Sequence, residues 1–309
     1  MGAAASPEAE LGPVRPAAGR AFRRWTMAGA FLAPTIVLLV AIAGFPLAYN
    51  LYNSFLHLVL TEPGTERFVG LANYRQLVAS GDFLQPFIRT SFFTLVSVAL
   101  EFVAGLGLAL IMHRRFWGRG LVRAAVLVPW AVPTVVSGML WKNMFDPGSG
   151  FVDWGLGALH LPGATTAWLN GVWTSWTVIL VADAWKNTPF LALILLAGLQ
   201  VIPDDLYEQA RIDGAGVLRR FRHVTLPMLK PAVLVALIFR TLSAFLIFDV
   251  IYVITGGGPG SATETLSYVN WRAFLVETNF GYGGAISVAL TLIALLIALV
   301  YMRVLRLET

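Results

Sequence analysis

The sequence contains no cysteine, very little charge and few histidines. Without cysteine, the chain can form no disulfide, thiol nucleophile or thiolate metal site. Only 13% of its 309 residues are Asp, Glu, Lys or Arg, whereas 57% are hydrophobic and the mean hydropathy is +0.73. A soluble domain of this length needs a far larger charged surface, so the composition indicates a polytopic membrane protein.

The positions of the histidines, the distribution of charge and two incomplete motifs argue against an enzyme and against a nucleic-acid partner. All four histidines lie between the apolar stretches, which disfavours a metal site inside the membrane. The net charge of +5 comes from short basic runs between apolar segments, where membrane topology explains them. The glycine-rich run 256–260 lacks the Lys-Ser/Thr ending of a phosphate loop, so no nucleotide site is expected. Asp213-Gly214-Ala215 opens a lipid-headgroup transferase motif whose downstream aspartates are missing.

Six stretches are apolar over the roughly 20 residues that a helix needs to cross the hydrocarbon. We expect an all-α fold of six transmembrane helices within residues 25–309, preceded by a disordered cytoplasmic tail, 1–24. The first apolar stretch is too long for a signal-peptide core, so we expect it to remain uncleaved. Asn187-Thr188-Pro189 interrupts the fourth stretch and predicts a kink. The expected spans are Met27–Tyr49, Ser91–Met112, Ala124–Met144, Val172–Val201, Pro231–Ile254 and Ala285–Val304.

The basic residues predict the orientation of these spans. With the N-terminus inside, 15 of the 22 Lys and Arg residues lie on the cytoplasmic side. Both termini are therefore expected in the cytoplasm. The segments 50–90, 145–171 and the glycine-rich segment after Thr255 then lie outside, and one long loop, about 202–230, remains inside.

The long inside loop has the pattern of two short helices. Asp205 and Glu208 are spaced as a capping box, and Gly214 suits the left-handed residue that ends a helix. A second, basic helix is expected over 217–224 and should stop at Leu226-Pro227. Such a compact polar element is suited to docking into a groove of a soluble partner.

The same loop resembles the coupling loop of binding-protein-dependent ABC permeases. Its signature is Glu-x-Ala, three residues, Gly, nine residues, an aliphatic residue, x, Leu-Pro. One position departs from the family, Gln209, where alanine is usual; glutamine preserves the helix. The residues that match are Glu208, Ala210, Gly214, Val224, Leu226 and Pro227, with Asp213 before the glycine.

Other segments resemble the carbohydrate branch of this family, which includes maltose, trehalose and glycerol-3-phosphate permeases. They are 68–74, 185–190, 197–203 and 248–257, and the trehalose type is the nearest. The resemblance implies the type I ABC importer fold in a bacterial cytoplasmic membrane. It implies a non-catalytic chain that passes a sugar by alternating access, and that binds no cofactor because ATP and Mg²⁺ belong to partner ATPases.

The resemblance also implies partners. These are a second homologous permease, two ATPase subunits, an extracytoplasmic solute-binding protein or lipoprotein, and membrane lipid. By this resemblance Glu208 and Asp213 make polar contacts with the ATPase, and Ala210 and Gly214 permit close packing. An importer of another solute class and an ion-coupled secondary transporter are the alternatives; the latter would need no coupling loop.

Ionisable residues inside spans are costly and usually face a cavity or a partner. We expect Glu101 and Arg240 to pair across two helices. Asp183 and Lys186, three apart on a helix, either pair with each other or contact solute. Sugars bind through hydroxyl-directed hydrogen bonds and aromatic stacking, so five neighbouring residues are further candidates for the solute path. They are Trp185, Asn187, Phe248, Asp249 and Tyr252.

Overall fold

The structure is a computed structural model that describes residues 18–114, 116–163 and 166–306. The expected tail therefore lies mostly outside the described residues, and helix starts at Ala18, within the stretch assigned to the tail. The chain divides into two compact units, which meet in the sequence between Tyr52 and Asn53.

The first unit is one long apolar helix. It consists of α1 (Ala18–Leu39), a π-helical turn (Val40–Gly44) and α2 (Phe45–Asn53). Within Gly29–Asn53, an 18-residue window has a mean hydropathy of 2.3. This segment is long enough to span a membrane and agrees with the first predicted span.

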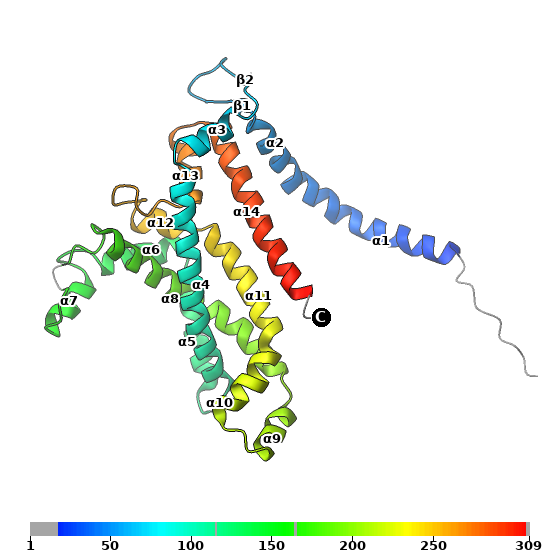
Figure 1. The fold of residues 1–309 in the computed structure, drawn as a ribbon, viewed down its shortest axis with the longest axis vertical. Helices are drawn as coiled ribbons and strands as arrows, with labels where there is room; N and C mark the ends of the chain where they lie inside the picture. Colours follow the sequence, from blue (N-terminus) through cyan, green and yellow to red (C-terminus); the bar gives the residue numbers. More distant parts are fainter. Residues whose placement is uncertain (1–17, 115, 164–165, 307–309) are drawn as a thin grey trace, which may run out of the picture. The chain divides into compact units, whose positions relative to one another are not determined.

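The second unit is built on three long helices, α4, α8 and α11, with α14 packed beside α11 (Figure 1). The two-stranded antiparallel ribbon pairs Leu56 with Phe68 and His57 with Arg67. The elements are β1 (Leu56–His57), β2 (Arg67–Phe68), α3 (Ala72–Ala79), α4 (Leu84–His113), α5 (Arg119–Ala131), α6 (Thr134–Met144), α7 (Phe151–Ala158), α8 (Val172–Val201), α9 (Asp204–Ile212), α10 (Val217–Arg220), a π turn (Phe221–Thr225), α11 (Leu226–Phe245), α12 (Asp249–Ile254), α13 (Leu266–Trp271), a second π turn (Arg272–Val276) and α14 (Phe280–Arg306).

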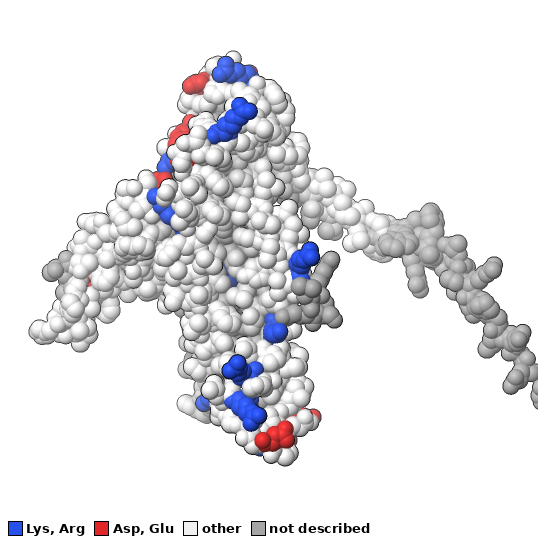
Figure 2. Space-filling model, viewed as in Figure 1, with Lys and Arg blue, Asp and Glu red and all other residues white. Residues whose placement is uncertain are grey.

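Within the described residues, five helices are long and apolar enough to cross a membrane, and the number is six if the bent pair α5–α6 is counted as one span. The predicted six-span, all-α fold is confirmed. Figure 1 places α9 and α10 at one end of the second unit, and β1, β2, α3 and α13 at the other. Basic side chains predominate toward the α9–α10 end, whereas basic and acidic side chains are mixed at the other end (Figure 2); the predominance agrees with the predicted cytoplasmic position of α9 and α10.

The effects of two prolines on the third and fourth predicted spans differ. The third span is not one helix, because α5 and α6 meet at an angle of 91°. Val132 is extended there, with φ −70° and ψ 131°, as expected for a residue before Pro133. Pro189, in contrast, does not break the fourth span, since α8 runs continuously through it.

The fifth span also differs from its prediction. The helix does not stop at Leu226-Pro227 but continues as one apolar helix, Val217–Phe245. The amide of Leu226 bonds to the carbonyl of Phe221, five residues back, and this wider π turn accommodates the proline ring. The helix then ends at Phe245, and α12 is a separate short helix after the break.

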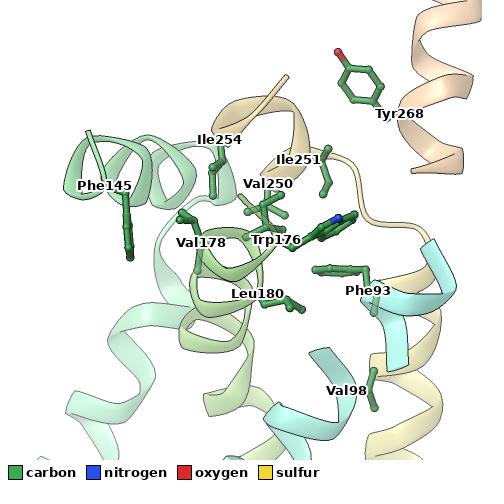
Figure 3. Packing of buried hydrophobic residues seen from close by; sticks show 13 residues of the cluster. Phe93, Val98, Phe145, Trp176, Val178, Leu180, Val250, Ile251, Ile254 and Tyr268 are labelled. Carbon is green, nitrogen blue, oxygen red and sulfur yellow. The ribbon is translucent and has the colours of Figure 1, made fainter. Parts of the chain in front are cut away.

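Buried apolar side chains hold these helices together. Toward the α12 end, Phe93 of α4, Trp176 and Val178 of α8, and Ile251 of α12 pack into one cluster (Figure 3). A second cluster joins α4, α8 and α11 nearer to α9; it includes Met112, Leu191, Leu195, Leu199 and Leu229. The core therefore continues along α8 from one end to the other.

Glycines allow the closest helix contacts. A Cβ atom on Gly198 of α8 would lie 2.4 Å from Cβ of Ala232 and 2.9 Å from Cδ1 of Leu229, both on α11. Gly107 of α4, in contrast, has nothing within 4 Å of such an atom. Small residues that let two backbones approach are a main source of specificity between helices in membranes.

We predict that Gly198→Ala destabilises the protein, because α8 and α11 must move apart. Overpacking of this kind costs about 1–3 kcal/mol. The thermal unfolding midpoint of the purified complex in lipid nanodiscs should fall for Gly198→Ala and stay the same or rise for the control Gly107→Ala. Equal midpoints for the two variants would show that the close contact is unimportant.

Candidate coupling loop and solute cavity

The short helix α9 is largely exposed and lies in the sequence between the two long helices α8 and α11. It starts one residue before the predicted cap: Pro203 is its N-cap, and neither Asp205 nor Glu208 caps it with a side chain. The predicted capping box is therefore wrong, because Pro203, with an extended backbone (φ −62°, ψ 136°), occupies the N-cap position in place of Asp205. The two aspartates of the first turn, Asp204 and Asp205, still stabilise the helix, because their negative charges lie at the positive end of the helix dipole.

The end of α9 agrees with the sequence prediction. Gly214 has φ +74°, in the left-handed region that glycine adopts without steric cost. The amide of Ala215 bonds to the carbonyl of Ala210 at 2.9 Å, and that of Gly214 to Arg211 at 3.0 Å. These bonds satisfy carbonyls that the helix end would leave unpaired.

The coupling signature divides between two elements. Glu208, Asp213 and Gly214 are exposed on α9 and its C-terminal turn, and Ala210 is half-buried there. Leu226 and Pro227 lie instead at the start of α11, which continues toward the cavity. On the inner face of α9, Leu206 and Tyr207 pack onto the core, and the Tyr207 hydroxyl lies 3.1 Å from Oγ1 of Thr225. These contacts attach α9 to the start of α11.

A buried charge cluster joins α4, α8 and α11. The structure brings Glu101 and Arg240 into contact, as predicted, and adds Asp183. All three are at most 4% exposed. The Arg240 guanidinium donates to both carboxylates, with NH2 2.7 Å from Oε1 of Glu101. Ser97 Oγ lies 2.9 Å from Oε1 of Glu101, 2.7 Å from Oδ2 of Asp183 and 2.8 Å from NH2 of Arg240.

Lys186 does not form the ion pair with Asp183 that the spacing suggested. Its ammonium donates to the carbonyls of Val132 and Trp130, while Asp183 turns to Arg240. The sharp bend between α5 and α6 leaves carbonyls at the end of α5 without helical partners, and Lys186 satisfies them. The lysine therefore connects α8 to the break in the third span.

A cavity of about 310 Å³ opens beside this cluster. Five of the seven solute-path candidates line it, and it brings together residues of α6, α8, α11, the segment before α12 and the start of α12. Asn187 lies at its wall, with Nδ2 2.8 Å from Oδ1 of Asp183. The lining residues are Thr134, Asp183, Lys186, Asn187, Arg240, Ser243, Leu246, Ile247, Phe248 and Asp249.

The other two candidates, Trp185 and Tyr252, are not among these lining residues. The Trp185 ring contacts Trp141 edge-on, at a centroid distance of 5.9 Å. Tyr252 stacks on Phe248 at 5.4 Å and meets Trp271 at 4.9 Å. Because Phe248 does line the cavity, Tyr252 belongs to an aromatic group at its edge.

Comparison with known proteins identifies the family. Residues 101–307 match the family described as the binding-protein-dependent transport system inner membrane component. The chain belongs to this family.

Named relatives are permeases of the same kind. The trehalose/maltose transport system permease protein MalF of Thermococcus litoralis is 44% identical over 249 residues, which cover 81% of this chain and 83% of the relative. The trehalose transport system permease protein SugA of Mycobacterium tuberculosis is 41% identical over 272 residues, 88% of this chain and 86% of SugA. The protein is therefore a multi-pass inner-membrane component of a binding-protein-dependent transport system.

A solved structure agrees with the fold. The permease superposes with a TM-score of 0.79 on a chain of a bacterial ABC transporter involved in the import of the acidic polysaccharide alginate. The match covers 93% of this chain and 98% of the other at 22% identity. The ABC importer permease fold expected from the sequence is confirmed.

Three polar residues at these sites were missed by the sequence reasoning. Ser97 lies four residues before Glu101 and Ser243 three after Arg240, so helical spacing from a charged residue could have revealed both. Thr134 lines the cavity only because the chain bends at the preceding proline, and no spacing rule indicates this.

We predict that Arg240→Met strongly destabilises the permease. Removing one partner of a buried ion pair leaves uncompensated charge and costs about 3–5 kcal/mol. The double variant Arg240→Met/Glu101→Gln should regain part of this loss, because Asp183 keeps its bonds from Ser97 and Asn187. The amount of inserted protein and its thermal midpoint measure the effect, with the exposed Ser243→Ala as control. A single variant as stable as wild type would contradict the prediction.

Proposed function

We propose that this permease carries a sugar through the cytoplasmic membrane as part of an ATP-driven importer, by alternating access. A disaccharide of the trehalose or maltose type is the proposed cargo. The observation that carries the proposal is that the same two helices, α8 and α11, both line the cavity and lead directly into the coupling loop.

The chemistry of the cavity supports a polyhydroxylated solute. Thr134, Asn187 and Asp249 offer hydroxyl, amide and carboxylate groups for hydrogen bonds, and Phe248 offers an apolar ring face. Two relatives point in the same direction: MalF is a trehalose/maltose transport system permease and SugA a trehalose transport system permease.

The connection between loop and cavity supports the mechanism. A rigid displacement of α9 is passed to α8 through Pro203 and to α11 through Tyr207 and Thr225. The close Gly198–Ala232 contact makes α8 and α11 move together near this end. Movement at the loop then changes the position of Asp183 and Arg240 beside the solute.

The proposal includes the remaining subunits. A second permease of the same family, two ATPase subunits and an extracytoplasmic solute-binding protein complete the importer. ATP and Mg²⁺ are bound by the ATPases, and this chain contributes no catalytic residue. Exposed Glu208 and Asp213 make the polar contacts to the ATPase groove, beside the exposed apolar side chain of Ile212.

We predict that Glu208→Lys abolishes solute-stimulated ATP hydrolysis by the assembled complex, because a charge reversal on the docking face repels the groove. The measurement is ATPase activity and ATPase co-purification of the complex in lipid. The control is Glu66→Lys, the same change at an exposed position near β2. A Glu208→Lys complex that assembles and hydrolyses ATP like wild type would remove the main support for the docking role.

We predict that Asn187→Leu weakens solute handling without preventing assembly. Loss of a hydrogen bond between neutral groups is worth about 0.5–1.5 kcal/mol, or roughly a 2- to 12-fold rise in the half-saturating solute concentration for uptake. Thr177→Val is the matched control, because this hydroxyl lies on the same helix and bonds to its own backbone at Trp173. Equal uptake kinetics for the two variants would exclude Asn187 from the solute path.

A further inference from the structure

A second arginine cluster lies at the end of the second unit opposite α9. Arg272, the first residue after α13, bonds through NH1 to both oxygens of Glu264 at 2.8 Å. Its other nitrogens lie 3.4 Å from Oδ1 of Asp82 and 3.2 Å from Oε1 of Glu277. We call these four residues the outer arginine cluster. A guanidinium can make such divided contacts because its five N–H groups point in fixed, separate directions.

The cluster joins segments that are far apart in the sequence. Asp82 lies just before α4, Glu264 lies in the glycine-rich segment between α12 and α13, and Glu277 precedes α14. The Tyr282 hydroxyl of α14 donates to Oδ2 of Asp82 at 2.9 Å. One arginine at the end of α13 thereby ties the beginnings of α4 and α14 to one loop.

The glycine-rich segment is shaped to reach this arginine. The Tyr268 hydroxyl bonds to the Gly256 carbonyl at 2.7 Å, and Thr263 Oγ1 to the Gly258 carbonyl at 2.7 Å. A Cβ atom on Gly257, which has φ +84°, would lie 2.8 Å from Cγ of Glu264. The loop therefore folds back onto Glu264, whose side chain is only 12% exposed.

The charge of the cluster makes the arginine indispensable. Burial by itself lowers the pKa of Arg272, but the three carboxylates of Glu264, Glu277 and Asp82 raise it by more than burial lowers it. The net change in pKa is upward, and the guanidinium stays charged. Without it, three carboxylates would lie together, one of them nearly buried. Repulsion among these carboxylates would then push apart the segments that carry Asp82, Glu264 and Glu277.

The cluster is also connected to the cavity. Trp271, next to Arg272, contacts the ring of Phe248 at a centroid distance of 5.7 Å and that of Tyr252 at 4.9 Å. Phe248 lines the cavity. A shift of α13 relative to α4 therefore reaches the edge of the solute site.

We propose that Arg272 is a positioning residue for the solute-binding protein: it holds the loop 255–265, the α3–α4 connection and the start of α14 as one docking surface. This inference rests on the proposed importer function. It follows from the place of the cluster, at the end opposite the ATPase-facing α9, and from its direct packing on the aromatic edge of the cavity. The partner surface is that of a folded protein that must deliver its solute at this edge.

The test is a titration of the complete importer in nanodiscs with its solute-binding protein loaded with trehalose or maltose. Arg272→Gln is expected to raise the half-saturating concentration of the binding protein for ATPase stimulation by about tenfold, or about 1.4 kcal/mol. The maximal rate at saturation should be retained. Arg272→Lys should give a smaller rise, because it keeps the charge but not the divided contacts.

Two further variants keep the test decisive. Arg272→Gln/Glu264→Gln removes the unpaired carboxylate and should recover part of the affinity, and Arg75→Gln, an exposed arginine of α3, should behave as wild type. If Arg272→Gln does not insert, Glu264→Gln alone is expected to show the same rise. An unchanged half-saturating concentration, or a loss confined to the maximal rate, would overturn the proposal. A wild-type complex that the loaded binding protein does not stimulate would instead contradict the importer function itself.

Discussion

The architecture depends on the buried contact of Arg240 with Glu101 and Asp183. It joins α4, α8 and α11 at one point, with almost no solvent access. Two carboxylates, one guanidinium and the Ser97 hydroxyl satisfy one another, although a hydroxyl has one proton and can donate to one carboxylate at a time. Because burial of unpaired charge is so costly, the three helices can separate only if the whole cluster rearranges. That makes the cluster a constraint on every conformational change at the adjacent cavity.

The cluster also lies between the cavity and the proposed coupling loop. Asp183 belongs both to the cluster and to the cavity wall, and Asn187 one turn later contacts the same carboxylate. At the other end of the same helix, Pro203 starts α9 directly. The proposed solute contacts and the proposed coupling loop are thus joined by a continuous helix rather than by flexible loops. A long helix transmits displacement well, which is what alternating access requires of it.

Sequence reasoning predicted much of this and failed for identifiable reasons. Glu101 and Arg240 could be paired because charged residues in apolar helices need partners, and Gly214 could be placed because its conformation is nearly specific to glycine. A pair of Asp183 with Lys186 was one of two predictions left open, because helical spacing gives neighbours within a helix and carries no information about Arg240, 57 residues away. The effect of each proline was equally hidden: Pro133 bends a span by 91°, whereas Pro189 and Pro227 lie within continuous helix. Whether a proline breaks a helix depends on packing partners, which a single sequence does not reveal.

The repeated use of one arginine between carboxylates from different segments has a physical reason. In a lipid environment apolar surfaces gain little by packing on each other, since lipid tails are equally apolar. Apolar clusters such as that around Phe93 and Trp176 fill space but do not by themselves select one arrangement of helices. Directional, charge-assisted bonds do, and they are strong where water is scarce. Arg240 forms such bonds at the centre of the unit, between α4, α8 and α11, and Arg272 forms them at its outer end, between the start of α4, the end of α13 and the start of α14.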